Sequence, residues 1–392
     1  MQGIYLGSLD SPDTTRLTDS VSPAVYAAGQ LFWVRGGTAL VAQRLDLERR
    51  QLVGSAATVA DHVAMDVITG SIAVTASASG LIAYRTGSGG RRQLVWYDRS
   101  GKTLGVVGPP DDTALSAPRV SPDGRRVAVG RTGQGNQDIW LLDGARASRL
   151  TFDSAADRFP VWSPDGSRIL FDSTRKGTRD LYVKSSSGAG DEGLVVESRQ
   201  GGVDKSATDW SPDGRFVMYR SVEAQTGRDI WVLPLATGKP YVFMSTPFEE
   251  NHGTFSSDGR WIAYESNETG RFEVYVRPFI DGSGLGAGRP GGKWQVSTDG
   301  GIQPRWRYDG REVYYLGPDG QMMEAPTRMS ADAFDVGTPV KLFDTRIYGG
   351  GTDIAQGNQY DVTHDGRFLI NTVMDEATAP ITMLQNWKPP AN

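Results

Sequence analysis

The side chains best suited to catalysis or metal binding are few and scattered in this sequence. Its 392 residues contain no cysteine and three histidines, His62, His252 and His364. No two of these histidines have the short spacing of a paired metal ligand, so a multi-histidine site needs three distant segments to converge. One local cluster, His252 with Glu249 and Glu250, could supply acid and base groups or hold a metal. This cluster supports the enzymatic alternative, a hydrolase or lyase.

Motifs of the common enzyme classes are absent or in the wrong setting. The stretch "GAGDEG" at 188–193 matches G-x-G-x-x-G, but the strand-like "LVVES" follows it instead of a helix that could receive a phosphate. The chain has no G-x-S-x-G elbow for a serine nucleophile, and the V-A-I-K, H-R-D and D-F-G motifs of protein kinases are also missing. The sequence therefore favours binding over catalysis, and we expect no cofactor.

The charge pattern narrows the class of partner. There are 41 basic and 46 acidic residues, interspersed along the chain, and the formal net charge is −5. No basic run could neutralise a row of phosphates, so we do not expect a nucleic-acid partner. The first residues have no basic region followed by an apolar one, and no stretch approaches the roughly 18 apolar residues of a membrane span. We expect no membrane insertion by this chain.

A strand-turn-strand motif built on S-P-D-G recurs along the chain. Proline presets φ, the aspartate can bond nearby backbone and glycine accepts positive φ, so S-P-D-G predicts a tight turn. Apolar runs with period two, such as "RFVMYRS", follow the turns. Two weaker copies, at Gly29 and Gly80, keep the glycine and the apolar run but not the aspartate. Aligned on the turn glycine, the other copies are 42 to 56 residues apart, at Gly124, Gly166, Gly214, Gly259, Gly310 and Gly366.

A period of this length indicates a repeat architecture, and antiparallel sheets stacked radially would bury their faces. The sequence predicts an all-β fold, a β-propeller of four-stranded antiparallel blades that forms a single, monomeric domain over 1–392. Eight copies predict eight blades, with seven as the alternative. We expect strands from both termini to close the ring, with 1–19 supplying outer strands to the sheet of "YDVTHDGRFLINT" and "ITMLQNW" competing for one of those places. Trp162 and Trp210, just before two turns, should pack between sheets.

Regular carboxylates accompany the repeat. They stand in the turns and directly before the third strand of several units, as in Asp138, Asp180, Asp229 and Glu273. A catalytic group is needed once, whereas a group that builds a blade is needed in each blade. These carboxylates are therefore interpreted as structural.

At these motifs the chain resembles the TolB-like, WD-like propeller repeats of bacteria, of the PD40 type. More narrowly, "GIYLGSLD", "PVWSPDGSRI", "GRWIAYESNETGRFEVYVRPF" and "APITMLQNW" look like the C-terminal propeller region of bacterial serine/threonine protein kinases. That resemblance implies a sensor or interaction module in kinase-associated signalling, and an extracytoplasmic location, because a membrane segment usually separates kinase from propeller. It leaves open whether this chain is a fragment or a free-standing derivative.

Candidate binding residues lie in loops that differ between repeats. The turns project from one face of such a ring, and the loops before the first strand and after the second project from the other. Binding residues are expected on loops held by a rigid scaffold. We therefore expect a peptide, a protein segment or a small polar ligand at the variable face and axial funnel. The candidate residues are Arg158, Lys205, Asn251, His252, Gln303, Arg305, Gln359 and Tyr360.

Overall fold

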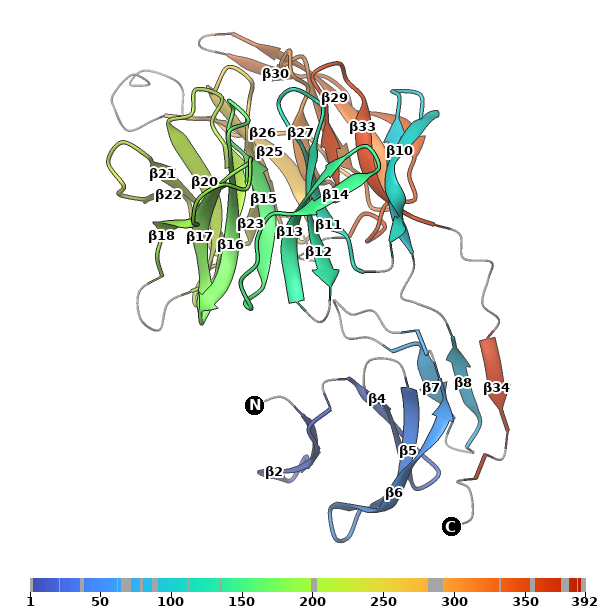
Figure 1. Ribbon diagram of the computed structural model, residues 1–392. Coiled ribbons are helices and arrows are strands. Elements are labelled where there is room, and N and C mark those ends of the chain that lie inside the picture. The colour runs from blue at the N-terminus through green and yellow to red at the C-terminus, as the bar shows by residue number, and fades with distance from the viewer. Residues whose placement is uncertain are drawn as a thin grey trace. The chain divides into compact units, whose positions relative to one another are not determined.

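The protein is all-β and divides into two compact units (Figure 1). The computed structural model describes residues 3–388 except 21, 36–38, 62, 65–71, 78–79, 87–90, 112, 134–135, 199–202, 281–291, 331–332, 353–356, 375–380 and 386. One unit comprises 92–373, and the other comprises 1–91 with 374–392. The sequence predicts one domain over 1–392 instead. In the described part of the chain, no helix is long and apolar enough to cross a membrane.

Six antiparallel sheets make up the described part of the unit 92–373, all but one of them four-stranded. The first three are β11 (Ser116–Val120), β12 (Val127–Gly133), β13 (Asn136–Asp143) and β14 (Arg146–Arg149); β15 (Asp157–Trp162), β16 (Arg168–Lys176), β17 (Thr178–Ser185) and β18 (Gly193–Val196); and β19 (Lys205–Trp210), β20 (Phe216–Glu223), β21 (Gly227–Pro234) and β22 (Tyr241–Met244). The next two are β23 (Glu250–Phe255), β24 (Trp261–Ser266), β25 (Glu273–Pro278) and β26 (Trp294–Gln295); and β27 (Ile302–Trp306), β28 (Glu312–Leu316), β29 (Gln321–Met329) and β30 (Phe334–Val336), with β31 (Val340–Asp344) also paired to β29. The sixth is β32 (Tyr360–Val362), β33 (Phe368–Val373), β9 (Arg92–Tyr97) and β10 (Thr103–Asp111).

The first strands of these sheets form a closed ring. In order, β11, β15, β19, β23, β27 and β32 each contact the next, and β32 contacts β11. The sixth sheet closes the ring because β33, from the end of the unit, pairs with β9, from its beginning. In each sheet, the turn between the first two strands contains one of the six turn glycines from Gly124 to Gly366. The predicted count of eight blades is not confirmed, since the described residues of this unit give six.

The strand that closes the ring differs from the one expected. The segment 4–18 forms β1 (Ile4–Ser8) and β2 (Ser11–Thr18), which pair with each other, and "ITMLQNW" contributes β34 (Ile381–Leu384), which pairs with β8 (Ile82–Arg85). Burial explains the difference. The run 92–97 is largely apolar and places Leu94 fully inside, whereas β2 is mostly polar and exposed and could not fill a position between two sheets.

The second unit holds the two weak copies of the repeat. Its described strands form a sheet of β3 (Ala24–Ala27), β4 (Gln30–Arg35), β5 (Ala39–Asp46) and β6 (Gln51–Ala60), a sheet of β34, β8 and β7 (Val74–Ala76), and the β1–β2 pair. Phe32, Leu40 and Ile82 join the two larger sheets in one core, and Trp387 meets the Phe32 ring edge-on at 6.0 Å. The copies at Gly29 and Gly80 therefore build sheets outside the six-sheet unit.

The repeated turn has the predicted geometry. All six turn glycines have φ between 67° and 82°, which L side chains rarely adopt. In the turn before β16, Ser163 Oγ donates to Asp165 at 2.5 Å, and the backbone N–H of Ser167 donates to the same carboxylate at 3.0 Å. Hydrogen bonds from Ser163 and Ser167 lower the pKa of Asp165 to about 2. The turn carboxylates thus hold the turn, as predicted.

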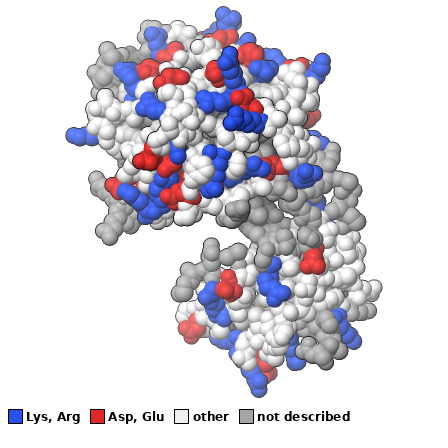
Figure 2. Space-filling model, viewed as in Figure 1, with Lys and Arg blue, Asp and Glu red and all other residues white. Residues whose placement is uncertain are grey.

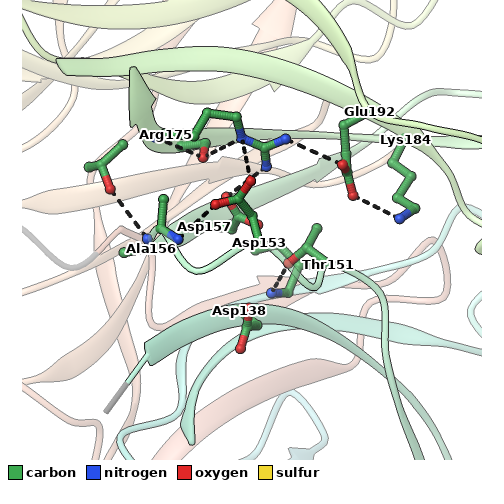
Figure 3. Close-up of polar contacts among 12 residues, drawn as sticks. Asp138, Thr151, Asp153, Ala156, Asp157, Arg175, Lys184 and Glu192 are labelled. Carbon is green, nitrogen blue, oxygen red and sulfur yellow. Dashed lines mark hydrogen bonds and ion pairs between the residues drawn. The ribbon is translucent and has the colours of Figure 1, made fainter. Parts of the chain in front are cut away.

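Polar groups also join neighbouring segments away from the turns (Figure 3). Arg175 on β16 donates to Asp157 at 3.1 Å and to Glu192 at 3.3 Å, and Lys184 donates to Glu192 at 2.7 Å. The carboxylates expected before the third strands lie within those strands, and they behave in the same way, as when Asp138 accepts from Arg149 Nη2 at 2.9 Å. Their partners are local, which supports the structural interpretation.

Candidate functional site

A funnel opens on the turn face of the six-sheet unit. Its volume is about 570 Å³, and each of the six sheets contributes to its lining. The residue five positions before each turn glycine lies in this lining, and we call these residues the inner ring: Arg119, Val161, Asp209, Thr254, Arg305 and Asp361. The funnel is large enough for several side chains of a ligand.

Bulges in the first strands precede the inner ring. The pairing register shifts between Ser116 and Arg119 on β11, and equivalent shifts occur on β15, β19, β23 and β27. Phe159, His252 and Gln303 at these bulges have φ of 49° to 55°, which is unusual for residues other than glycine. A bulge bends the strand and re-aims its side chains. The same bulge therefore recurs in five of the six first strands and positions their inner-ring residues, whereas β32, which carries Asp361, pairs in regular register.

The two inner-ring carboxylates are fixed by the neighbouring sheets. Asp209 Oδ2 accepts hydrogen bonds from Thr254 Oγ1 and from the Phe255 backbone N–H, both at 2.8 Å. Asp361 Oδ2 accepts from the Val120 N–H at 2.8 Å. Burial raises the pKa of both aspartates, and the positive charge of Arg119 opposes this. These groups hold adjacent sheets together.

The two inner-ring arginines differ in how well they are paired. Arg119 donates to the Thr208 carbonyl and lies 3.9 Å from Asp361. Arg305 lies 3.3 Å from the same Asp361 through Nε, yet its buried Nε and Nη2 have no hydrogen-bond acceptor among the described residues. The Arg305 side chain is only 6% exposed. A nearly buried guanidinium with open hydrogen-bonding capacity thus borders the funnel.

Aromatic side chains line the rest of the funnel. Trp162, Trp210 and Trp306 contribute to the wall although each is buried, and the first two pack between sheets as predicted. Tyr308 is 56% exposed, and its ring stacks on His364 at 3.7 Å. These two residues stand in the turns of the fifth and sixth sheets, where S-P is replaced by R-Y and T-H. The turn face is therefore less uniform than the repeat suggests.

Among the described residues, the opposite end of the axis is nearly closed. The pocket there has a volume of about 20 Å³, close to the space that one water needs. Asn251 and His252, two of the predicted binding residues, line this pocket. No other predicted binding residue among those described lines it, and Arg305 lines the funnel instead. The sequence analysis expected an open binding face on this side, whereas the described residues leave only this small pocket.

Several predicted binding residues bond to one another. Glu265 accepts from His252 Nδ1 at 2.9 Å, taking that nitrogen as the protonated one, and from the Gln303 N–H at 2.6 Å. Gln303 Oε1 accepts from the Gln359 N–H at 2.7 Å, and the Tyr360 hydroxyl donates to the Gln303 carbonyl at 2.8 Å. These contacts join three consecutive sheets. The residues form a structural network at this end of the axis.

The remaining predicted residues lie near that network. Lys205 Nζ donates to Ser198 Oγ at 2.6 Å and to the Val203 carbonyl at 3.2 Å. Arg158 on β15 stands opposite Asp172 on β16 in the strand register, and burial lowers the pKa of Arg158. Both belong to a partly buried charged zone beside the small pocket.

The cluster proposed for acid-base or metal chemistry is not assembled. His252 pairs with Glu265, whereas Glu250 accepts from Thr246 and Glu249 lies 3.4 Å from Arg228. His62 is outside the described residues. Across the described part of the chain, no group of three or more histidine, aspartate or glutamate residues is arranged to hold a metal ion.

Sequence reasoning missed Arg119, Asp209, Asp361 and Tyr308. A signal for the first three existed in the column five residues before each turn glycine, which reads Arg, Val, Asp, Thr, Arg, Asp. Structural columns of a repeat keep one residue type, whereas this column mixes two cationic, two anionic and two uncharged residues. Such variation at one fixed phase indicates side chains that meet at an axis.

Comparison with known proteins bears on the fold. Residues 77–221 match the family model described as PD40, TolB beta propeller domain. An uncharacterized protein of Agrobacterium fabrum (strain C58 / ATCC 33970) is 26% identical over 145 residues, which are 36% of this chain and 46% of that relative. The match therefore spans less than half of the relative's length.

Solved structures extend the comparison over more of the chain. A protein of Agrobacterium tumefaciens provisionally identified as TolB superposes with a TM-score of 0.56 at 20% identity, covering 73% of this chain and 99% of that one. TolB from Acinetobacter baumannii covers 89% of this chain and 79% of its own at 13% identity, with a TM-score of 0.40. The first of these likenesses concerns the fold alone, and together with the family model it leads to one conclusion: the chain has a TolB-like β-propeller fold.

Proposed function

We propose that the unit 92–373 is a binding module that holds an extended peptide or protein segment in the funnel on its turn face. The observation that carries this proposal is the funnel of about 570 Å³ that all six sheets line. Ligand sites in proteins are typically concave, largely apolar and supplied with a few fixed polar groups. The buried aromatic wall and the inner ring supply both.

The charge distribution favours a peptide over a polyanion. The funnel lining contains Arg119, Arg305, Arg307 and Arg367 and, against them, Asp123, Asp209, Asp361 and Asp365. Figure 2 shows the same interspersion of basic and acidic side chains over the visible face. A mixed surface of this kind suits a partner with both charges, and rim charges mainly tune association rate and salt dependence. A small polar ligand remains the alternative occupant.

Binding is proposed here without catalysis. Each inner-ring aspartate accepts a backbone hydrogen bond that fixes its place, and His364 lies stacked on Tyr308. Nucleophilic or acid-base catalysis requires a reactive group within hydrogen-bond reach of an activating partner. A role in kinase-associated signalling is a further proposal that the sequence resemblance alone supports.

A displayed peptide library selected on the purified protein tests this proposal. Binding of the selected peptides can be followed by intrinsic fluorescence, because Trp162, Trp210 and Trp306 line the funnel. We expect Tyr308→Ala to weaken binding roughly tenfold, as loss of an aromatic contact residue often does. Arg215→Ala is the matched control, since Arg215 is exposed on another turn and does not line the funnel.

A second control distinguishes the two ends of the axis. Lys205→Ala removes a residue predicted to bind at the opposite face. Unchanged affinity in Lys205→Ala and Arg215→Ala, with loss in Tyr308→Ala, supports the funnel. Loss in Lys205→Ala with full affinity in Tyr308→Ala would place the ligand at the opposite face and reject this proposal.

A further inference from the structure

The inner ring has an imbalance around Arg305. Asp361 lies between two cations, 3.3 Å from Arg305 and 3.9 Å from Arg119. Arg119 has a second acceptor in the Thr208 carbonyl, and its charge also acts on Asp209. Among the described residues, Arg305 has only the shared Asp361, and its Nε and Nη2 have no hydrogen-bond acceptor. Arg305 is therefore the less satisfied cation of the ring.

Leaving such a group unpaired is costly. A buried charged donor without an acceptor loses the hydrogen bonds that water gave it, and only a protein or ligand acceptor restores them. Arg305 lines the funnel while its Nε and Nη2 are covered, so the guanidinium has to turn toward the funnel to meet a ligand that enters from the turn face. The open capacity therefore predicts an acceptor on the ligand.

A carboxylate fits this position better than a phosphate does. A guanidinium presents a planar fork of donors that matches a carboxylate in size and geometry. Asp209 and Asp361 lie in the same ring, so a ligand with nearly two negative charges would meet more repulsion than a singly charged one. The aromatic wall next to Arg305, with Trp306 directly following it, suits the remainder of a peptide.

We propose that the segment bound in the funnel carries a carboxylate, from an aspartate, a glutamate or its own C-terminus, and that this group pairs with Arg305. This inference rests on the proposed function. It adds that the funnel selects for one acidic group at its innermost part. Arg305 then serves as a specificity residue of the binding module.

The test uses peptides selected on the wild-type protein and resynthesised in two forms. One form keeps the acidic group, and the other replaces it by the amide, Asp to Asn, Glu to Gln or a C-terminal amide. On wild-type protein, the amide form should bind roughly tenfold to a hundredfold more weakly, since a hydrogen-bonded charge is lost. This comparison needs no protein variant, so a folding defect cannot obscure it.

Protein variants then assign the effect to one residue. In Arg305→Met the acidic and amide forms should bind equally, whereas in Tyr308→Ala both should weaken by the same factor and keep their ratio. Arg305→Lys should retain part of the preference, because it keeps the charge and loses the fork. Inorganic phosphate at the same concentration should compete less well than acetate.

The outcomes of these experiments distinguish failure of the carboxylate proposal from failure of the proposed binding function. If the acid and amide forms of the peptides bind the funnel with equal affinity, the proposed carboxylate contact is wrong, and the proposed binding function is unaffected. Phosphate competing better than acetate would also overturn the carboxylate contact. Failure of every peptide to respond to Tyr308→Ala would reject the funnel and the carboxylate together.

Discussion

The two ends of the propeller axis are built from the same first strands but differ in the space they leave and in how their polar side chains are paired. At the turn end the first strands line a funnel of about 570 Å³, and at the other end the described residues leave a pocket of about 20 Å³. Polar groups at the closed end pair with one another, and Glu265 accepts from His252 in its own sheet and from Gln303 in the next sheet. At the open end, Nε and Nη2 of Arg305 have no hydrogen-bond acceptor among the described residues. The small pocket also has buried atoms without a hydrogen-bond partner in the described part of the chain, Asn251 Oδ1, Thr208 Oγ1 and Asn358 Nδ2. The funnel is distinguished by its larger volume together with a charged donor that lacks an acceptor within that described part.

The largest expected effect tests whether the funnel wall belongs to the core. Trp210 lines the funnel but is 6% exposed and packs against Val161, Leu170 and Leu181 of the preceding sheet. Trp210→Ala should lower the free energy of unfolding by roughly 3–5 kcal/mol, the usual cost of emptying an aromatic site. Tyr308→Ala, at an exposed funnel residue, should change it by less than about 0.5 kcal/mol. Chemical denaturation of both variants measures the contrast, and equal losses would contradict it.

The closed end should also be a stability element. Glu265→Ala leaves the Asn251, His252 and Gln303 donors without their acceptor, so we expect a loss of about 3 kcal/mol. Glu265→Gln keeps one acceptor oxygen and should lose less. Peptide affinity, measured on the folded fraction, should stay at the wild-type value. A loss under about 1 kcal/mol in Glu265→Ala would show that the network is not structural.

A smaller effect follows from pH. Burial raises the pKa of Asp172 to about 7, against the attraction of Arg179, Arg158 and Arg220. Between its ordinary pKa and this value, the native state holds a proton that the unfolded chain has released, so stability falls as pH rises. Asp172→Asn does not titrate, and its stability relative to wild type should rise by on the order of 2 kcal/mol from about pH 5 to about pH 8. Denaturation at both pH values checks this, and a relative stability that stays flat or falls would contradict the assignment.

The local sequence pattern was sufficient to predict the turns, but it was insufficient to predict which strands close the ring. Each S-P-D-G motif reports its own turn, because serine, aspartate and glycine act within a few residues. The copies at Gly29 and Gly80 also have strands on either side, but nothing local says which unit those strands join. The pairing of β9 with β33 joins segments more than 270 residues apart, and a turn motif carries no information about it.

The site was harder to predict for a related reason. Arg305 was expected to bind, but on the face opposite the turns, because the repeat made the turn face look uniform. Which end of the axis is open depends on six side chains at one phase of six separate strands, and on the bulges at residues such as Phe159 and Gln303. Neither the bulge nor the side-chain packing at the axis has a signature in a single repeat.

Hydrogen exchange with and without a selected peptide tests the central claim most directly, because it reports which end of the axis the ligand covers. At saturating peptide, we expect slower exchange at 120–124, 306–309 and 362–366 on the turn face, and unchanged exchange at 204–206 and 357–359 at the closed end. Protection confined to 204–206 and 357–359, with the turn face unchanged, would contradict the account.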